Sequence, residues 1–318
     1  MSAPPAGRDL AARLREHDLS AAPAVLNLVE SRTAEARAQT RELLSALSPA
    51  ELGQEAGGHI VGVTGPPGVG KSSLLSRLVA EWRRRGRSVA VLAVDPSSRR
   101  SGGSLLGDRA RIERDPGDAS VFIRSTAAGE RLGGLAPATR AAAGALAVAF
   151  DVVVIETVGV GQSETEVADV ADTVAVIVQP GSGDVLQFLK SGIMEIPDVL
   201  VVTKADLGQV AVRAQGDLRA ALRSLGAGTA VLAVSSMAPG TGIEALTDAL
   251  DEHRAGLDLA QRRLASRRAH ALADFVAEYG DRGLRALGGR REAERWLARQ
   301  PRSADVASLE RALESHAG

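Results

Sequence analysis

Short apolar runs alternate with helical stretches through the middle of the chain. From Ile60 onward the runs are rich in β-branched residues and nearly continuous, which is typical of strands in a parallel sheet covered on both faces. Most segments between the runs carry apolar residues at helical spacing. This alternation predicts an α/β fold with a doubly wound, mostly parallel sheet. The six runs that predict strands are Ile60–Thr64, Val89–Val94, Val152–Ile155, Val174–Val178, Val199–Val202 and Ala230–Val234.

The two ends of the chain have a different pattern. Residues 8–47 are polar and Ala-rich, and their spaced leucines predict two helices separated near Ser20–Pro23. Beyond about Gly256 the strand pattern stops, and Arg- and Ala-rich stretches predict helices with thin apolar faces. Such helices fold best against the main domain or against a second copy of the chain. We therefore expect an N-terminal helical extension (1–57), a central α/β domain (58–256) and a C-terminal helical arm (257–318).

Composition removes several classes of protein. The 318 residues have a net charge of −1, which gives no electrostatic preference for nucleic acid or for an anionic membrane. The absence of Cys excludes disulfides and thiolate metal sites. The start has no apolar signal-peptide core and the chain has no run of about 18 apolar residues, so we expect a cytoplasmic protein without a membrane span.

Lysine is rare in this chain. Of the 38 basic residues only three are lysines, namely Lys71, Lys190 and Lys204, and the others are arginines. Arg and Lys differ in shape, hydration and donor geometry, so a lysine that persists in an Arg-rich chain marks a place that a guanidinium does not suit. All three lysines lie in or next to segments that the motifs below assign to a nucleotide site.

A phosphate-binding loop follows the first predicted strand. Its residues satisfy G-x-x-x-x-G-K-[ST] and precede a predicted helix, which is the structural context that the motif requires. The glycines let backbone N–H groups turn toward phosphate oxygens, Lys71 contacts the β- and γ-phosphates, and the Ser72 hydroxyl reaches Mg²⁺. We assign nucleotide binding to Gly65, Pro66, Pro67, Gly68, Val69, Gly70, Lys71, Ser72 and Ser73.

An acidic residue follows a second buried strand. Asp151–Gly159 reads DVVVIETVG, so the strand delivers Glu156 to the carboxyl edge of the sheet and a glycine follows three residues later. P-loop enzymes have this layout, more commonly with Asp. Glu156 either holds a water on Mg²⁺ or orients the attacking water, and the Gly159 amide is placed to sense the γ-phosphate.

A third motif favours guanine as the base. Thr203-Lys204-Ala205-Asp206 follows a predicted strand where GTPases usually carry Asn-Lys-x-Asp. The carboxylate of Asp206 accepts two hydrogen bonds from guanine that adenine cannot supply, and leaving such a carboxylate unsatisfied costs about 1–3 kcal/mol. The Lys204 stem lies along the base. We expect Thr203 to weaken the local hydrogen-bond network. The base loop is completed by Ser235, Ser236 and Met237.

Two further segments adjoin the phosphate site. Asp95 ends a predicted strand and so emerges at the same sheet edge, and the Ser/Gly-rich stretch up to Asp108 has the composition of a loop that closes over phosphates. Gly181–Lys190 follows another strand, and Lys190 is placed to bridge to an acid or to a phosphate in one nucleotide state.

Taken together, these segments resemble the MeaB/ArgK family of methylmalonyl-CoA mutase-associated GTPases, over roughly residues 20–255. The stretches that carry the resemblance are VGVTGPPGVGKSSL, VDPSSRRSGGSLLGDRAR, DVVVIETVGVGQSE and LKSGIMEIPDVLVVTKAD.

The resemblance implies a GTP-driven chaperone, with GTP/GDP and Mg²⁺ as ligands. It implies a homodimer formed through the C-terminal arm, which gates cofactor loading and protection of an adenosylcobalamin-dependent mutase. Asp95, Asp108, Glu156 and Lys190 match switch positions of the family, and the first three join Ser72 as magnesium ligands. Thr203 departs from the family's usual Asn, which leaves open a subgroup serving a different acyl-CoA mutase. Whether an adenosyltransferase is a further partner also stays open.

Other function classes were weighed against this one. A metallochaperone needs Cys or His clusters, and the chain has no Cys and only scattered histidines. A nucleotide-dependent kinase linked to amino-acid transport is the main alternative, although no acceptor domain is evident. A scaffold that does not hydrolyse nucleotide is the third. Hydrolysis is expected to be slow without a partner, because Val160 stands where a water-positioning Gln is common.

Overall fold

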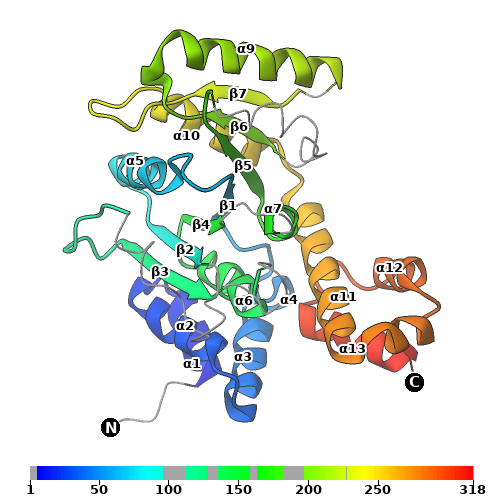
Figure 1. Ribbon diagram of the computed structural model, residues 1–318. Helices are drawn as coiled ribbons and strands as arrows, with labels where there is room; N and C mark the ends of the chain where they lie inside the picture. The colour runs from blue at the N-terminus through cyan, green and yellow to red at the C-terminus, as the bar shows by residue number, and fades with distance from the viewer. Residues whose placement is uncertain are drawn as a thin grey trace, which may run out of the picture. The chain divides into compact units, whose positions relative to one another are not determined.

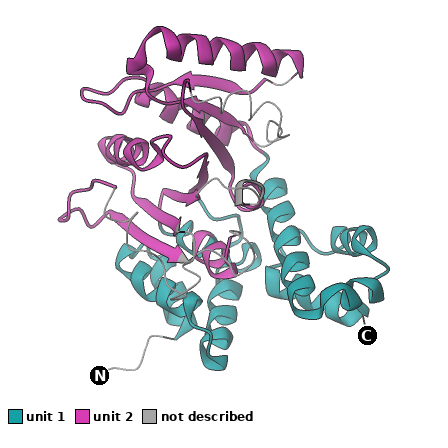
Figure 2. Cartoon of the chain, viewed as in Figure 1, with its two compact units in different colours: residues 1–57, 144–149, 258–318 teal, residues 58–143, 150–257 magenta. Residues whose placement is uncertain are grey.

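The computed structural model describes residues 6–95, 112–127, 135–157, 163–181, 197–226 and 228–317, without the side chains of residues 95, 127 and 163–165. The chain divides into two compact units (Figure 2). The sheet unit consists of residues 58–143 and 150–257, and the helical unit consists of residues 1–57, 144–149 and 258–318. Each unit is described separately below.

A seven-stranded parallel sheet forms the centre of the sheet unit (Figure 1). The strand order is β3-β2-β4-β1-β5-β6-β7, and every strand pair is parallel. The α/β fold class expected from the sequence is therefore confirmed. The strands are β1 His59–Thr64, β2 Val89–Asp95, β3 Val121–Ala127, β4 Val152–Thr157, β5 Thr173–Val178, β6 Val199–Val202 and β7 Ala230–Ala233.

Strand β3 was not expected from the sequence. It lies at the edge of the sheet, beside β2. Val121 and Ile123 are buried, whereas Phe122 and Arg124 are only partly buried. Its sequence, VFIRSTA, has three apolar residues followed by Arg124, Ser125 and Thr126, so it lacks the longer apolar run by which the other strands were recognised.

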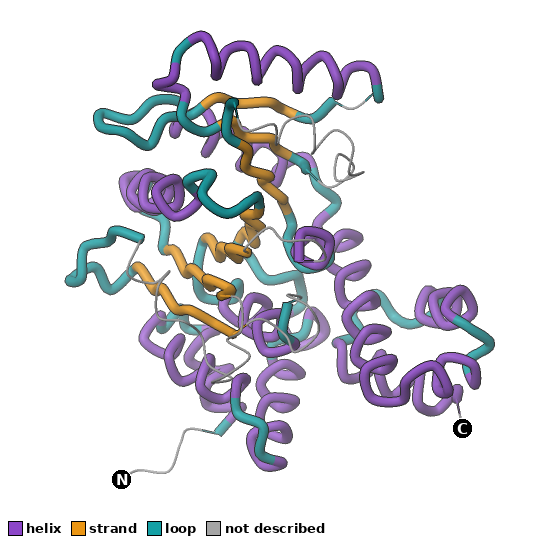
Figure 3. Tube along the Cα trace, viewed as in Figure 1, coloured by secondary structure: helices purple, strands orange, loops and turns teal. Residues whose placement is uncertain are grey.

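Helices cover both faces of the sheet (Figure 3). On one face, leucines of α5 (Lys71–Arg84) and α10 (Ile243–Gly256) pack in a single buried cluster with Val61 and Val63 of β1. On the other face, α7 (Ser163–Ala168) lies so close to β1 that a Cβ on Gly62 would come within 2.7 Å of Val167. The remaining helices of this region are α6 Pro137–Leu146, η4 Ala205–Leu207 and α9 Gln209–Ser224.

The strand order places a switch point at β1. The chain leaves β1 through α5 toward β2 on one side, whereas β5, β6 and β7 extend the sheet on the other side. In open α/β sheets, ligands bind at the carboxyl ends of the strands at such a reversal. The loop after β1 therefore occupies the position where this fold binds ligands.

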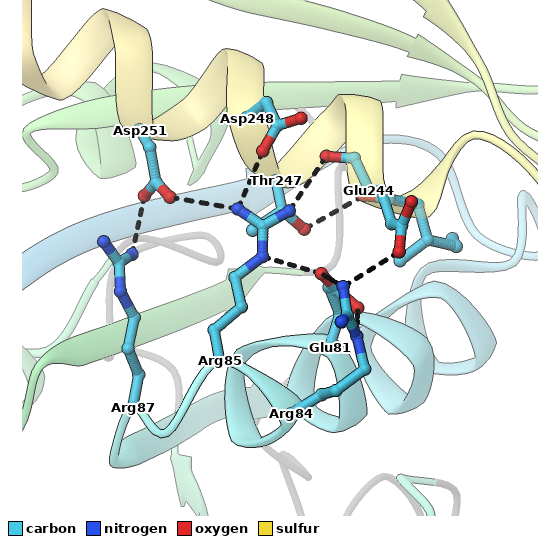
Figure 4. A network of polar contacts seen from close by, with 9 residues as sticks. Glu81, Arg84, Arg85, Arg87, Glu244, Thr247, Asp248 and Asp251 are labelled. Atoms are coloured by element: carbon cyan, nitrogen blue, oxygen red, sulfur yellow. Dashed lines mark hydrogen bonds and ion pairs between the residues drawn. The ribbon is translucent and has the colours of Figure 1, made fainter.

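An ion-pair network fixes the far end of α5 to α10 (Figure 4). Arg84 donates two hydrogen bonds of 2.8 Å to the Glu81 carboxylate and a third to Glu244. The hydrogen bonds from Arg84 lower the pKa of Glu81, against the opposite effect of burial. The other members are Arg85, Arg87, Asp248 and Asp251. The helix that follows the phosphate loop is thus held by charge as well as by its apolar face.

The N-terminal part of the helical unit contains more helices than the sequence predicted. Residues 23–47 were expected to form one helix, but the structure ends one helix at Glu30 and begins the next at Ala34. The Thr33 side chain accepts a hydrogen bond from the Ala36 amide and so caps the second helix. The helices are α1 Gly7–Arg15, α2 Ala22–Glu30, α3 Ala34–Ala46 and α4 Pro49–Leu52.

The C-terminal helices have an apolar core of their own. They are α11 Leu259–Ala286, which is broken at Gly280, α12 Arg290–Ala298 and α13 Val306–Ala317. The buried residues of this core are Ala271, Leu272, Phe275, Leu287, Ala293, Leu297, Leu309 and Leu313. The Arg267 guanidinium also binds Glu55 through two hydrogen bonds of 2.9 Å within the helical unit. The three-part division of the chain, with an arm from residue 257, stays a prediction.

Among the helices that the structure describes, none is long and apolar enough to cross a bilayer.

Candidate nucleotide-binding site

The loop between β1 and α5 has the backbone that its glycines permit. Gly65 has φ +149° and approaches β5 so closely that a Cβ there would lie 2.2 Å from the Ile177 carbonyl oxygen. Gly70 has φ +96° and is the N-cap residue of α5, immediately before Lys71. Any other residue at Gly65 would push the loop off the sheet, and a side chain at Gly70 would strain the start of the helix. The loop therefore brings its backbone against the carboxyl ends of the strands.

Lys71 is folded into this loop. Its side chain is 8% exposed, and Nζ donates hydrogen bonds to the carbonyl oxygens of Gly65 at 2.7 Å and Pro66 at 3.0 Å. A buried ammonium group needs such partners to offset its desolvation. The positive charge at the end of α5 lies inside the loop, which suits the phosphates of a nucleotide.

Ser72 and Glu156 meet beside the loop. The Ser72 hydroxyl lies 3.4 Å from Glu156 Oε1, and Glu156 is 5% exposed at the end of β4. A hydrogen bond of 2.9 Å between the hydroxyls of Thr157 and Thr64 joins the ends of β4 and β1. A hydroxyl and a carboxylate oxygen at this separation are the hard ligands that Mg²⁺ prefers, so these residues fit a magnesium ion.

Other predicted site residues are only partly described. Asp95 is the last residue of β2, where its backbone pairs with Ala127 one position beyond the Val94–Thr157 pair. Its backbone therefore reaches the same edge of the sheet as Glu156. Asp108, Gly159 and Lys190 lie outside the residues that the structure describes.

The segment after β6 is attached to the phosphate loop. The buried Thr203 hydroxyl lies 2.7 Å from the Val69 carbonyl oxygen and 3.1 Å from the carbonyl oxygen of Val178. We expected the replacement of Asn by Thr to weaken hydrogen bonding here. Thr203 makes a direct bond to the phosphate loop, and the expected weakening relative to Asn stays a prediction. The two predicted halves of the site, for phosphates and for base, are thus in contact through one side chain.

Asp206 is oriented by the loop after β7. The Ser235 hydroxyl donates to Asp206 Oδ1 at 2.5 Å, and Ser235 itself is 4% exposed. Lys204 has a positive φ of 54° and donates a hydrogen bond to Gln179 at the end of β5. These contacts place the residues after β5, β6 and β7 together at one edge of the sheet. A carboxylate fixed in this way fits the hydrogen-bond donors of a guanine base.

Two residues with contacts in this region were missed by sequence reasoning. Gln179 holds Lys204, and Arg77 on α5 donates to the Ser236 carbonyl oxygen at 3.0 Å. Neither belongs to a motif, and in a chain with this many arginines no sequence signal marks Arg77. Among the described residues no group of three or more His, Asp or Glu side chains could hold a metal ion by itself.

Comparison with known proteins places the chain in a family. The family model described as methylmalonyl Co-A mutase-associated GTPase MeaB matches residues 22–282. “Putative GTPase PYRAB02490” from Pyrococcus abyssi is 41% identical over 269 residues, which cover 82% of this chain and 80% of that protein. “Putative GTPase PH0274” from Pyrococcus horikoshii is 46% identical over 199 residues, and the match spans 62% of this chain and 60% of that protein.

Two further comparisons extend this result. “Methylmalonic aciduria type A homolog, mitochondrial” from Caenorhabditis elegans is 41% identical over 212 residues, 63% of this chain and 50% of that protein. A solved structure of a LAO/AO transport system kinase has a TM-score of 0.66 and 28% identity, and covers 97% of this chain and 96% of its own. On the family match and the 41% identity to the Pyrococcus abyssi protein, the chain belongs to the MeaB family of methylmalonyl-CoA mutase-associated GTPases.

Proposed function

We propose that this GTPase binds an adenosylcobalamin-dependent acyl-CoA mutase and uses GTP to gate the loading of its cofactor and its protection from inactivation. Methylmalonyl-CoA mutase is the first candidate partner, because the family is named after its association with that enzyme and the Caenorhabditis elegans relative is named a methylmalonic aciduria type A homolog. The family match carries the mutase part of the proposal. The bond between Thr203 and Val69 supports the nucleotide part, because it joins the segment proposed to read the base to the phosphate loop.

The proposed roles follow from the chemistry of each group. The loop amides and the Lys71 ammonium bind the phosphates, and Asp206 accepts the hydrogen bonds of guanine with support from Ser235. Ser72 and Glu156, together with Asp95 and Asp108, supply oxygen ligands for Mg²⁺, which when bound neutralises phosphate charge. Gly159 and Lys190 respond to the γ-phosphate. Glu156 is buried next to Ser72, which favours a role at the metal over one at the attacking water.

A binding experiment with purified proteins tests the proposal. Methylmalonyl-CoA mutase is immobilised, and binding of this chain is measured with GDP and with a non-hydrolysable GTP analogue. We expect affinity to differ between the two nucleotides by about tenfold or more, a typical coupling free energy between two sites. The K71A variant, which should bind nucleotide roughly a thousandfold more weakly, should bind the mutase equally under both conditions at nucleotide concentrations too low to fill its site. Equal binding of the unmodified chain in both nucleotide states would contradict a role as a mutase gate.

The alternative function is a nucleotide-dependent kinase linked to amino-acid transport. It is favoured by the likeness to a structure named as a transport system kinase. The two functions differ in where the γ-phosphoryl group goes. With GTP labelled at that position, the GTPase releases labelled inorganic phosphate in proportion to GDP, whereas a kinase transfers label to an acceptor and leaves a deficit of free phosphate.

We also propose that the chain is a homodimer in the cytoplasm, formed through the arm of residues 257–318. The arm has its own core of eight buried residues, which fixes how its helices pack and therefore which side chains lie on its outer surface. Light scattering of the full chain should give twice the monomer mass of 32.8 kDa. A measured mass of one chain, at micromolar concentration and with GTP analogue present, would reject the dimer.

A further inference from the structure

The helix that follows the phosphate loop also contacts the base loop. Arg77 lies on α5, and its Nε donates a hydrogen bond of 3.0 Å to the Ser236 carbonyl oxygen in the loop after β7. The preceding residue, Ser235, is the one that donates to Asp206. We propose that Arg77 is a positioning residue for guanine recognition, acting on Asp206 through the Ser236–Met237 peptide. This proposal rests on the proposed role of Asp206 as the base-reading residue.

Both polar atoms of the Ser236–Met237 peptide have partners. Its carbonyl oxygen accepts from Arg77 at 3.0 Å, and its amide, on Met237, donates to Ser235 Oγ at 3.2 Å. A peptide group is planar, so fixing the oxygen at one end and the N–H at the other fixes the orientation of the whole plane. Removal of Arg77 frees one of these two points, and the peptide then rotates about its flanking bonds.

The hydrogen bonds run in one direction from α5 to Asp206. Arg77 donates to the carbonyl of Ser236, the Met237 amide donates to Ser235, and the Ser235 hydroxyl donates to Asp206 Oδ1 at 2.5 Å. In such a chain each bond polarises the next. The Ser235 oxygen accepts the Met237 amide while its single hydroxyl proton goes to Asp206, so the amide bond helps to orient that hydroxyl. The chain therefore fixes which carboxylate lone pairs remain for the base.

The partner of Arg77 separates it from the other arginines of α5. Arg83 donates to the Asp118 carboxylate at 2.7 Å and Arg84 to the Glu81 carboxylate at 2.8 Å. Both of these bonds go to carboxylates, and neither goes to the base loop. Arg77 instead binds a neutral backbone carbonyl, so within the part of the chain that the structure describes its removal leaves no carboxylate without its partner. A variant at Arg77 should therefore retain the fold, and Arg84 provides a matched control on the same helix.

The test compares nucleotides that differ only at the base. Affinities for GDP and inosine diphosphate are measured by calorimetry for the unmodified chain, R77A, R77K and R84A. Inosine lacks the exocyclic amino group, so the ratio of the two affinities reports how well the Asp206 carboxylate is placed. We expect R77A to lower this ratio about five- to tenfold, within the range for the loss of one hydrogen bond. R77K should restore part of it, and R84A should leave it unchanged.

Each outcome has a defined meaning. If R77A keeps the ratio of the unmodified chain, whether or not it weakens the binding of both nucleotides, Arg77 has at most a structural role and the inference is overturned. If R77A does not fold, the same comparison is made with R77K and R77Q, together with S235A, which breaks the next bond of the chain. If the unmodified chain itself shows no preference for GDP, the proposed role of Asp206 fails, and that result is distinct from a failure of Arg77 alone.

Discussion

The carboxyl edge of the sheet and the C-terminal helices differ in where their polar side chains lie and in what those side chains bind. At the sheet edge, several buried polar side chains bind specific partners. Lys71 binds carbonyl oxygens of its own loop and Ser235 binds Asp206. In helices α11–α13 the core is entirely apolar, and carboxylates crowd around it. Burial and the charge of Asp274 raise the pKa of Glu310 to about 7. Directional bonds at the edge are suited to ligand recognition, and the helices are suited to forming a surface.

Removal of the Lys71 ammonium should have the largest effect on GTP affinity, and it changes only the carboxyl edge of the sheet. K71A should weaken GTP binding by about 4 kcal/mol, or roughly a thousandfold, because the phosphates lose a buried charged partner. Calorimetric titration with GTP and Mg²⁺ measures this loss. The thermal stability of the apo protein should change little. GTP affinity equal to that of the unmodified chain would remove the basis for the phosphate site.

A cavity in the C-terminal helices should lower thermal stability and leave GTP affinity almost unchanged. Leu309 is fully buried in the core of α11–α13. L309A should destabilise these helices by about 3 kcal/mol, the usual cost of a buried Leu to Ala change. Scanning calorimetry measures the loss, and GTP affinity should stay within about twofold. As a matched control, L75A removes a buried leucine of α5 and should reduce both stability and GTP affinity. A large loss of GTP affinity in L309A would show that the two regions are energetically coupled.

The fold could be predicted where strands are continuous runs of apolar residues. The runs that became β1, β2, β4, β5, β6 and β7 are of this kind, and their observed bounds differ from the expected ones by at most two residues. Strand β3 escaped because its sequence, VFIRSTA, has only three consecutive apolar residues before Arg124. The break at residues 31–33 escaped because it depends on a single cap by Thr33. Patterns of burial are thus readable from sequence, whereas single side-chain bonds are not.

The candidate site shows the same division. The phosphate loop and the segment after β6 were recognisable because fixed spacing follows a strand, and the prediction of a GTPase is confirmed by the family match and by the names of the relatives. The bond from Thr203 to Val69 joins residues 134 positions apart, which no local pattern encodes. The same holds for Arg77 and Ser236, which are 159 positions apart. The individual roles of the site residues stay predictions.

A smaller effect, confined to the base end of the edge, is expected for Asp206. D206N should weaken GTP binding by about 2 kcal/mol, because an amide presents a donor where guanine also has donors. It should strengthen binding of xanthosine triphosphate, whose carbonyl accepts from that donor. Competition between the two nucleotides measures the switch. An unchanged preference in D206N would count against the base-reading role and would leave the phosphate end of the site unaffected.

The smallest effect concerns the carboxylates of the C-terminal helices. Glu310 on α13 faces Asp274 and Glu278 on α11 and Glu314 on its own helix, and burial together with these charges raises its pKa from 4.5 to about 7. His270 lies 3.0 Å from the Asp274 carboxylate. Because the folded state holds the Glu310 proton more tightly than the unfolded chain, stability should fall as the pH rises from about 4.5 through 7.

The E310Q variant separates this effect from other titrations. The Gln side chain keeps a donor for Asp274 at every pH, so the decline of the melting temperature between pH 5.5 and 8 should flatten. At pH 8 the variant should be more stable by about 1 kcal/mol, a value discounted for the partial exposure of the site, or a few degrees in melting temperature. The E294Q control removes an exposed carboxylate on α12 and should retain the slope of the unmodified chain. If E310Q melts with an unchanged slope, the carboxylates around the helical core do not differ energetically from exposed ones, and the contrast with the sheet edge is weaker than the structure indicates.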